Sequence, residues 1–211
     1  MNETKDKWAR VIIIGILMFI AALLILGYCL FDSCRIRHNT RLASEEYQEL
    51  ISYEAIEPEK KEIVPETEAP ASEEPADIQS VIPDDGNSYI GMISIPALDL
   101  NLPVLSECTE AKLYIAPCRY EGSAEEKNLI ICAHNYKSHF ARLKTLSVDS
   151  DVYFTDISGN EFRYKVAKTE RVKGEAIEYM KAGEWDLTLF TCTIGGASRE
   201  TVRCVLQPKH F

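Results

Sequence analysis

Two residues that together could carry out thiol chemistry, a cysteine and a histidine, each follow an apolar run in the second half of the chain. Cys192 ends the run LTLFT, and His134 ends the run NLIICA. A cysteine thiolate attacks carbonyl carbons, and an imidazolium can protonate the amine that departs. Arg199 follows Cys192 after the loop TIGGAS, and its permanently charged guanidinium can bind an oxyanion and lower a thiol pKa. This combination predicts acyl transfer at the rim of a folded domain.

Other residues compete for two of these roles. Arg203 lies on the same face of an extended strand as Arg199, and we favour Arg199 because a strand entrance lies at the rim. His139, in KSHFARL, suits a helix cap or a surface role, whereas His134 directly follows a buried strand and is preferred. Taken singly, each candidate also has a structural explanation, since a buried cysteine is commonly an inert small hydrophobe. We expect four other cysteines to be such structural residues: Cys108, Cys118, Cys132 and Cys204.

Three neighbours of these residues are candidates for substrate contact. Thr191 precedes Cys192 and could shape an oxyanion site or hydrogen-bond a substrate. Asn135 and Tyr136 follow His134 and could orient its ring or line a groove. The seven cysteines are odd in number and contain no CxxC pair, which argues against a disulfide scaffold and against a zinc site. We therefore expect no metal and no cofactor.

The chain begins with a charged tail at residues 1–10 and an uncharged apolar segment at residues 11–31. A helix of this length crosses roughly 30 Å of hydrocarbon. A cleaved signal peptide usually has a shorter apolar region and an Ala-x-Ala site, which this segment lacks. Basic residues are nearly equal in number on the two sides of the segment, so their distribution does not decide the orientation. The short tail and the large domain after the segment favour a cytoplasmic tail and an extracellular domain. The prediction is a single-pass anchor in the cell membrane.

Residues 32–86 join this anchor to the rest of the chain and are strongly acidic. Between Glu45 and Asp85 there are 14 Asp or Glu, two Lys and five Pro. Such a sequence repels itself and buries too little apolar surface to fold, which predicts a disordered, solvated stalk from about residue 43. A short helix is expected over residues 41–55. The acidic net charge of the whole chain, −10, comes from this stalk. The sequence shows no basic face of the kind that would indicate nucleic-acid binding.

Residues 87–211 carry short β-like runs separated by turn signals. In EFRYKVAKTERV, for example, Phe162, Tyr164 and Val166 share one strand face, and the preceding ISGN predicts a hairpin. Short helices are expected over HFARLKTL and over GEAIEYMKAG, the latter capped by Gly183. About eight strands in about 120 residues predict a mainly β domain that closes into a barrel.

The residues around Cys192 resemble the sortases, membrane-anchored cysteine transpeptidases of Gram-positive cell surfaces. The resemblance rests on LTLFTC followed by an arginine at the next strand, on AHNYKSHF and on YIGMISIPALDLNLPVL, and it covers residues 89–206. It implies an eight-stranded β-barrel with Cys192 as nucleophile, His134 as acid and base, and Arg199 as donor to the oxyanion and the substrate. An anchor at the amino terminus without one at the carboxy terminus favours class B or class D.

The resemblance also implies a reaction and its partners. A sorting motif near the carboxy terminus of a secreted protein would be cleaved through a thioacyl-enzyme and transferred to an amine of the cell wall, such as a peptidoglycan precursor. A surface cysteine peptidase that ends with water is one alternative, and a tethered binding domain with an incidental triad is another. An amine in the product separates transfer from hydrolysis, and ordinary alkylation reactivity of Cys192 would favour the binding domain.

Overall fold

The computed structural model describes residues 2–54, 87–181 and 185–208. The chain divides into two compact units, Met1–His38 and Asn39–Phe211. Helix α1 (Asn2–Glu54) contributes to both units. Most of the predicted stalk, residues 55–86, and the predicted cap Gly183 lie outside the described residues.

In the first unit, α1 exposes large apolar side chains on all sides. They run from Ile12 to Phe31, inside the predicted anchor. Among the helices that the structure describes, only α1 is long and apolar enough, by length and composition, to cross a membrane. A helix that is apolar all round and unburied is typical of a segment that meets lipid.

The end of α1 belongs to the second unit and packs on the barrel. Ala43 and Tyr47 lie four residues apart, on one helix face, and both are buried. The Tyr47 ring meets Tyr89 edge to face at 5.7 Å between centroids, and the Tyr89 hydroxyl donates to Glu46 at 2.8 Å. The helix predicted over residues 41–55 is therefore present. The prediction of disorder from about residue 43 is wrong as far as Glu54, where α1 ends, and the barrel covers the helix face that contains Ala43 and Tyr47.

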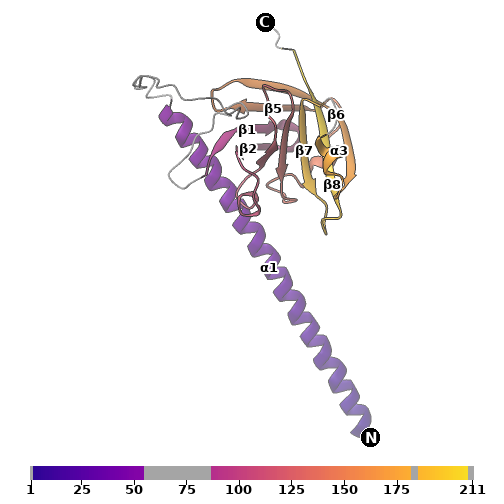
Figure 1. The fold of residues 1–211 in the computed structure, drawn as a ribbon. Helices are drawn as coiled ribbons and strands as arrows, with labels where there is room; N and C mark the ends of the chain where they lie inside the picture. The colour runs from indigo at the N-terminus through magenta and orange to yellow at the C-terminus, as the bar shows by residue number, and fades with distance from the viewer. Residues whose placement is uncertain (1, 55–86, 182–184, 209–211) are drawn as a thin grey trace, which may run out of the picture. The chain divides into compact units, whose positions relative to one another are not determined.

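Eight strands form a closed barrel in the order β1-β2-β3-β4-β7-β8-β6-β5 (Figure 1). The fold class predicted from the sequence is confirmed. The strands are β1 (Tyr89–Ile95), β2 (Leu100–Leu105), β3 (Cys118–Glu121), β4 (Leu129–Ala133), β5 (Asp151–Asp156), β6 (Glu161–Lys173), β7 (Leu187–Cys192) and β8 (Ser198–Leu206). The short helices are η1 (Pro96–Leu98), α2 (Glu110–Leu113), η2 (Leu143–Thr145) and α3 (Ile177–Lys181).

Two neighbouring pairs, β2–β3 and β4–β7, are parallel, and the other pairs are antiparallel. The β2–β3 pair is a single register position, whereas β4 and β7 match along five positions from Leu129–Leu187 to Ala133–Thr191. Because the chain leaves two adjacent parallel strands at the same edge, the residues after β4 and at the end of β7 lie at one end of the barrel.

Strand alternation fills the barrel interior with apolar side chains. Ile93, Val152, Leu189 and Val202 come from four different strands and are all fully buried in one cluster. Complete burial of each such side chain contributes roughly 1.5–3 kcal/mol. The opposite face of β7 packs against a second cluster that contains Phe190, so both faces of this strand are covered along most of its length.

Local structure departs from the sequence predictions over HFARLKTL. There the chain makes turns and only the 3₁₀ helix η2, because the amide of the buried Phe140 donates to the His134 carbonyl and the Ala141 amide donates to the Tyr136 carbonyl. The hairpin predicted at ISGN is present between β5 and β6, where Gly159 has a positive φ of 82° and the amide of Asn160 donates to the Asp156 carboxylate. The helix expected over GEAIEYMKAG is present as α3.

Candidate active site

Cys192 is the last residue of β7, and Arg199 lies directly opposite it on β8. Side chains of directly paired residues in an antiparallel ladder project from the same face. Cys192 is exposed, whereas the two residues that precede it on the same face of β7, Phe190 and Thr188, are buried. The thiol is thus presented at the strand end rather than enclosed in the core.

A tight loop keeps Cys192 and Arg199 in register. The Thr193 amide donates to the Ser198 carbonyl at 2.8 Å, and the Ser198 amide donates back to the Thr193 hydroxyl at 3.1 Å. Gly195 and Gly196 have φ of 84° and 74°, a region that favours glycine. The loop is also tied to the end of β6, since Gly174 donates to the Ala197 carbonyl at 3.0 Å.

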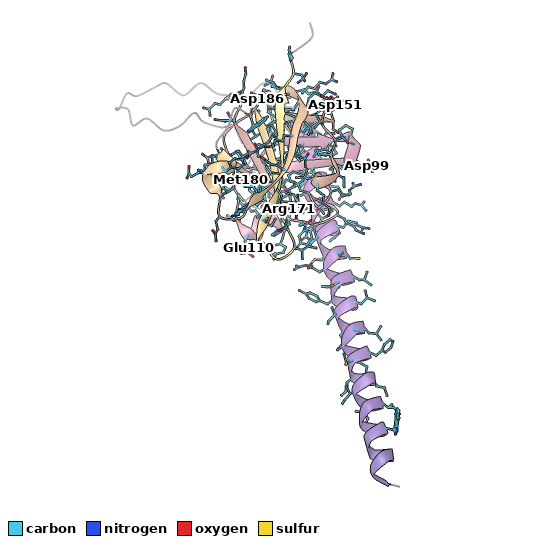
Figure 2. The ribbon with its side chains drawn as sticks, turned by 90° about the vertical axis from the view of Figure 1, so that its right-hand side faces the viewer. Asp99, Glu110, Asp151, Arg171, Met180 and Asp186 are labelled. Atoms are coloured by element: carbon cyan, nitrogen blue, oxygen red, sulfur yellow. The ribbon has the colours of Figure 1, made fainter. Side chains whose placement is uncertain are left out.

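His134 reaches the same end of the barrel from β4. Ala133 pairs with Thr191 in parallel register, so His134 and Cys192 occupy the next position on neighbouring strands. Adjacent strands lie about 4.8 Å apart. Figure 2 shows Asp186, just before β7, and Glu110, at the start of α2, toward opposite ends of the barrel. Because β4 runs parallel to β7 from Leu129 opposite Leu187 to Ala133 opposite Thr191, His134 lies at the end of the barrel away from Asp186.

Aromatic rings enclose the His134 imidazole. Tyr114 packs on it with 4.8 Å between ring centroids, and Tyr136 meets it edge to face at 5.2 Å. Its Nε2 is buried without a hydrogen-bond partner among the residues that the structure describes. Burial lowers the pKa of His134 below the ordinary value, against the opposing charges of Glu110 and Cys108. A neutral imidazole with an uncommitted ring nitrogen can accept a proton.

Arg199 and Arg203 share a strand face, as predicted, but have different surroundings. The Arg199 guanidinium lies 5.7 Å from the Phe190 ring centroid and donates one hydrogen bond to the Gly174 carbonyl. Arg203 is fully buried and donates to Glu170 at 3.1 Å, to Thr188 at 3.0 Å and to two carbonyls of α3. The guanidinium donors of Arg203 are occupied by Glu170, Thr188 and α3, as expected of a structural residue. Arg199, in contrast, lies beside the Cys192 thiol.

The three residues predicted to contact substrate occupy different environments. Tyr136 is half-buried against His134, and Asn135 is exposed next to it. Thr191 is buried, and strand alternation directs its side chain to the barrel interior, away from the face of Cys192. Among the described residues, no cluster of three or more His, Cys, Asp or Glu could hold a metal ion.

Comparison with known proteins gives the family. The description "Sortase domain" matches residues 93–209 of the chain, more than half its length. The chain belongs to the sortase family. Sortase A of Bacillus anthracis is 30% identical over 114 residues, 51% of this chain and 54% of the relative. This sortase therefore spans about half the length of the curated relative that it matches.

Solved sortases share the fold of this sortase. A lid mutant of sortase A from Corynebacterium diphtheriae superposes with a TM-score of 0.52 at 22% identity, covering 59% of this chain and 73% of that one. The complex of Streptococcus agalactiae sortase C1 and MTSET gives a TM-score of 0.51 at 22% identity, covering 58% and 69%. At these identities the likeness extends to the barrel architecture.

Sequence reasoning missed one neighbour of the candidate site in this sortase. Tyr114 lies 20 positions before His134, in the connection between β2 and β3, and nothing in its local pattern distinguishes it from a packing residue. The prediction of a cap or surface role for His139 is wrong. Its ring is fully buried, and the Thr40 hydroxyl lies 2.8 Å from its Nε2.

Acid is expected to destabilise this sortase through His139. Burial, with a smaller effect from the charge of His134, lowers the pKa of His139 to about 4. The unfolded chain binds this proton near pH 6.5, whereas the folded chain resists it until about pH 4. Stability is thus fully present above pH 6.5 and falls by about 3 kcal/mol as the pH drops to about 4.

Urea titrations of the full chain in detergent at pH 7 and pH 4.5 measure this loss. Carboxylates also titrate in acid, so the His139→Gln variant is the matched control. The wild type should lose more stability than the variant between the two pH values, and an equal loss would contradict a buried neutral His139.

Proposed function

We propose that this sortase is a cysteine transpeptidase that acts through Cys192, His134 and Arg199. The observation that carries the proposal is the register of three neighbouring strands, which sets Arg199 opposite Cys192 and His134 at the adjacent strand end. In the first step, the Cys192 sulfur attacks a peptide carbonyl and forms a tetrahedral oxyanion. His134, having accepted the thiol proton, donates it to the departing amine, and a thioacyl-enzyme remains. A second amine then attacks the thioester.

The surroundings of His134 suit both directions of this proton transfer. Its lowered pKa keeps the imidazole neutral at pH 7, which allows it to act first as a base. Once the tetrahedral intermediate has formed, the imidazolium is unstable in its partly buried site and gives its proton readily to the leaving amine, which leaves the acylated Cys192. The packed rings of Tyr114 and Tyr136 hold the imidazole orientation during both steps.

Arg199 is the proposed donor to the oxyanion and to substrate carbonyls. A guanidinium carries five N–H donors, and within the described residues Arg199 donates only one hydrogen bond, to the Gly174 carbonyl. That hydrogen bond and the Phe190 ring restrain the Arg199 guanidinium beside the Cys192 thiol. The remaining N–H donors of Arg199 can therefore bind negative charge that develops on the substrate.

The substrate-binding proposal rests on Tyr136 and Asn135, which lie beside His134 on the accessible side of the site. We propose that Thr191 acts only by filling the strand end beneath Cys192, because its side chain is buried. Ile194 is 96% exposed in the loop after Cys192 and adds an apolar contact for an extended peptide. The substrate is a sorting motif of a secreted protein, and the acceptor is an amine of the cell wall.

The class B or class D assignment and the cellular placement are parts of the same proposal. We propose that α1 anchors the chain in the cell membrane with residues 1–10 in the cytoplasm and the barrel outside. The apolar, unburied part of α1 supports the anchor. The relatives named above are a sortase A and a sortase C1, and identification of the peptide motif that this sortase cleaves would test the class B or class D assignment.

Product analysis tests transfer against hydrolysis. The full chain is incubated with a library of peptides, with and without hydroxylamine, and the products are read by mass spectrometry. A transpeptidase gives hydroxamate product that rises with hydroxylamine, together with a trapped acyl adduct on the peptide that contains Cys192. Carboxylate product alone at every hydroxylamine concentration would make the protein a peptidase, and the absence of any adduct would leave a binding domain.

A further inference from the structure

Three cysteines that the proposed reaction does not use meet beside the candidate active site. Cys108 lies in the connection between β2 and α2, Cys118 begins β3, and Cys132 is the fourth residue of β4. The Sγ atoms of Cys108 and Cys132 are 2.8 Å apart, and none of the three thiols forms a disulfide in the structure. A disulfide bond is about 2.05 Å long, so these sulfurs need to approach only a little further to bond.

We propose that Cys108 and Cys132 are a modification site at which a disulfide forms under oxidising conditions. The alternative partner, Cys118, pairs with Cys132 across β3 and β4, but its thiol donates to the Ala116 carbonyl at 3.4 Å and is fully buried. Cys108 is the exposed member of the cluster, and Cys132 contacts it directly. The 2.8 Å contact between the Cys108 and Cys132 sulfurs therefore favours this pairing.

The three thiols differ in pKa and in exposure, and these differences favour a defined order of thiol–disulfide exchange. Contact with the Cys118 and Cys132 thiols lowers the pKa of Cys108, whereas contact with Cys108 and burial raise the pKa of each of the other two. Cys108 is thus the thiolate and the accessible nucleophile. Cys132, behind it, is the resolving thiol.

The oxidant is a small disulfide such as oxidised glutathione. The Cys108 thiolate attacks one glutathione sulfur, breaks its S–S bond and releases one glutathione thiolate. Cys132 then loses its proton and attacks the Cys108 sulfur, which forms the protein disulfide and releases the second glutathione. Two protein thiols are oxidised by two electrons, and one glutathione disulfide is reduced to two thiols.

The bond would fasten the connection between β2 and β3 to β4. This connection contains Tyr114, whose ring packs on His134, and Cys132 lies two residues before His134 on the same strand. A disulfide that closes the 24-residue separation would restrict the unfolded chain and raise the melting temperature by on the order of 10 °C.

Peptide mapping tests the pairing on the full chain. Trypsin places Cys108, Cys118, Cys132, Cys192 and Cys204 on separate peptides, because Lys or Arg lies between each pair. After treatment with oxidised glutathione, free thiols are alkylated and the chain is digested without reduction. The expected species joins peptide 62–112 to peptide 128–137 and is lighter than their sum by two hydrogen atoms. The peptide that contains the buried Cys204 should remain fully alkylated.

Two variants and a melting curve make the test decisive. Cys118→Ser should retain the cross-link, and Cys108→Ser should lose both the cross-link and the dependence of melting temperature on glutathione redox state. Cys108 is exposed, so its replacement should leave the reduced fold unchanged. A cross-link through Cys118, or complete alkylation of both Cys108 and Cys132 after oxidation, would overturn the proposal.

Discussion

Replacing Cys192 by alanine is expected to lower transfer by at least roughly 10⁴-fold and to abolish the thioacyl adduct. The residue paired with Cys192 on β8 is Arg199, which cannot form a thioester in its place. The side chain is exposed at a strand end, so the free energy of unfolding should change by no more than about 0.5 kcal/mol. Intact-protein mass spectrometry after incubation with a cleavable peptide measures the adduct, and urea titration measures the fold.

The matched control is Cys204→Ala, which removes a thiol that is buried inside the barrel. This variant should form the adduct at the wild-type level per folded molecule, although the cavity costs some stability. Transfer retained in Cys192→Ala, or an adduct lost in Cys204→Ala with the barrel still folded, would place the nucleophile elsewhere.

The two arginines on the same face of β8 should give opposite effects. Arg199→Ala removes a donor beside the thiol and is expected to lower kcat by about 10²- to 10³-fold with little change in stability. Arg203→Ala leaves the Glu170 carboxylate without its buried partner, and it should cost about 3–5 kcal/mol of unfolding free energy. The proposed oxyanion donor and the structural ion pair are thus separable by experiment.

Steady-state kinetics and urea titration of both variants measure this separation. Arg199→Lys is a useful comparison, because it keeps the charge but loses the planar fork, and it should recover only part of the rate. A large stability loss in Arg199→Ala, or full stability in Arg203→Ala, would reverse the assignment of the two residues.

Sequence patterns predicted the elements whose alternation is strong. The runs that became β4, β6 and β7 show continuous or alternating apolar residues, and each is a strand in the barrel. Strand β3 was missed because CRYE is only four residues long and pairs on both sides mainly through its backbone. The helix predicted over HFARLKTL was wrong because Phe140 turns into the core.

The candidate site was predictable in its residue types but not in its surroundings. Arg199 and Arg203 have the same strand pattern, and only the packing of α3 and Glu170 against Arg203 distinguishes them. That packing brings together segments more than 20 residues apart. The contact between Cys108 and Cys132 likewise depends on the placement of the connection before α2, which no local spacing specifies.

The parallel pairing of β4 with β7 also has a consequence for how the protein matures. The two strands are adjacent in the barrel, yet β5, β6 and α3 lie between them in the chain. Contacts at such long sequence separation are slow to form because the intervening loop must close first. We therefore expect His134 and Cys192 to come together late in folding. A chain whose barrel is still open would carry an isolated thiol, and the assembled pair would appear only when the barrel closes.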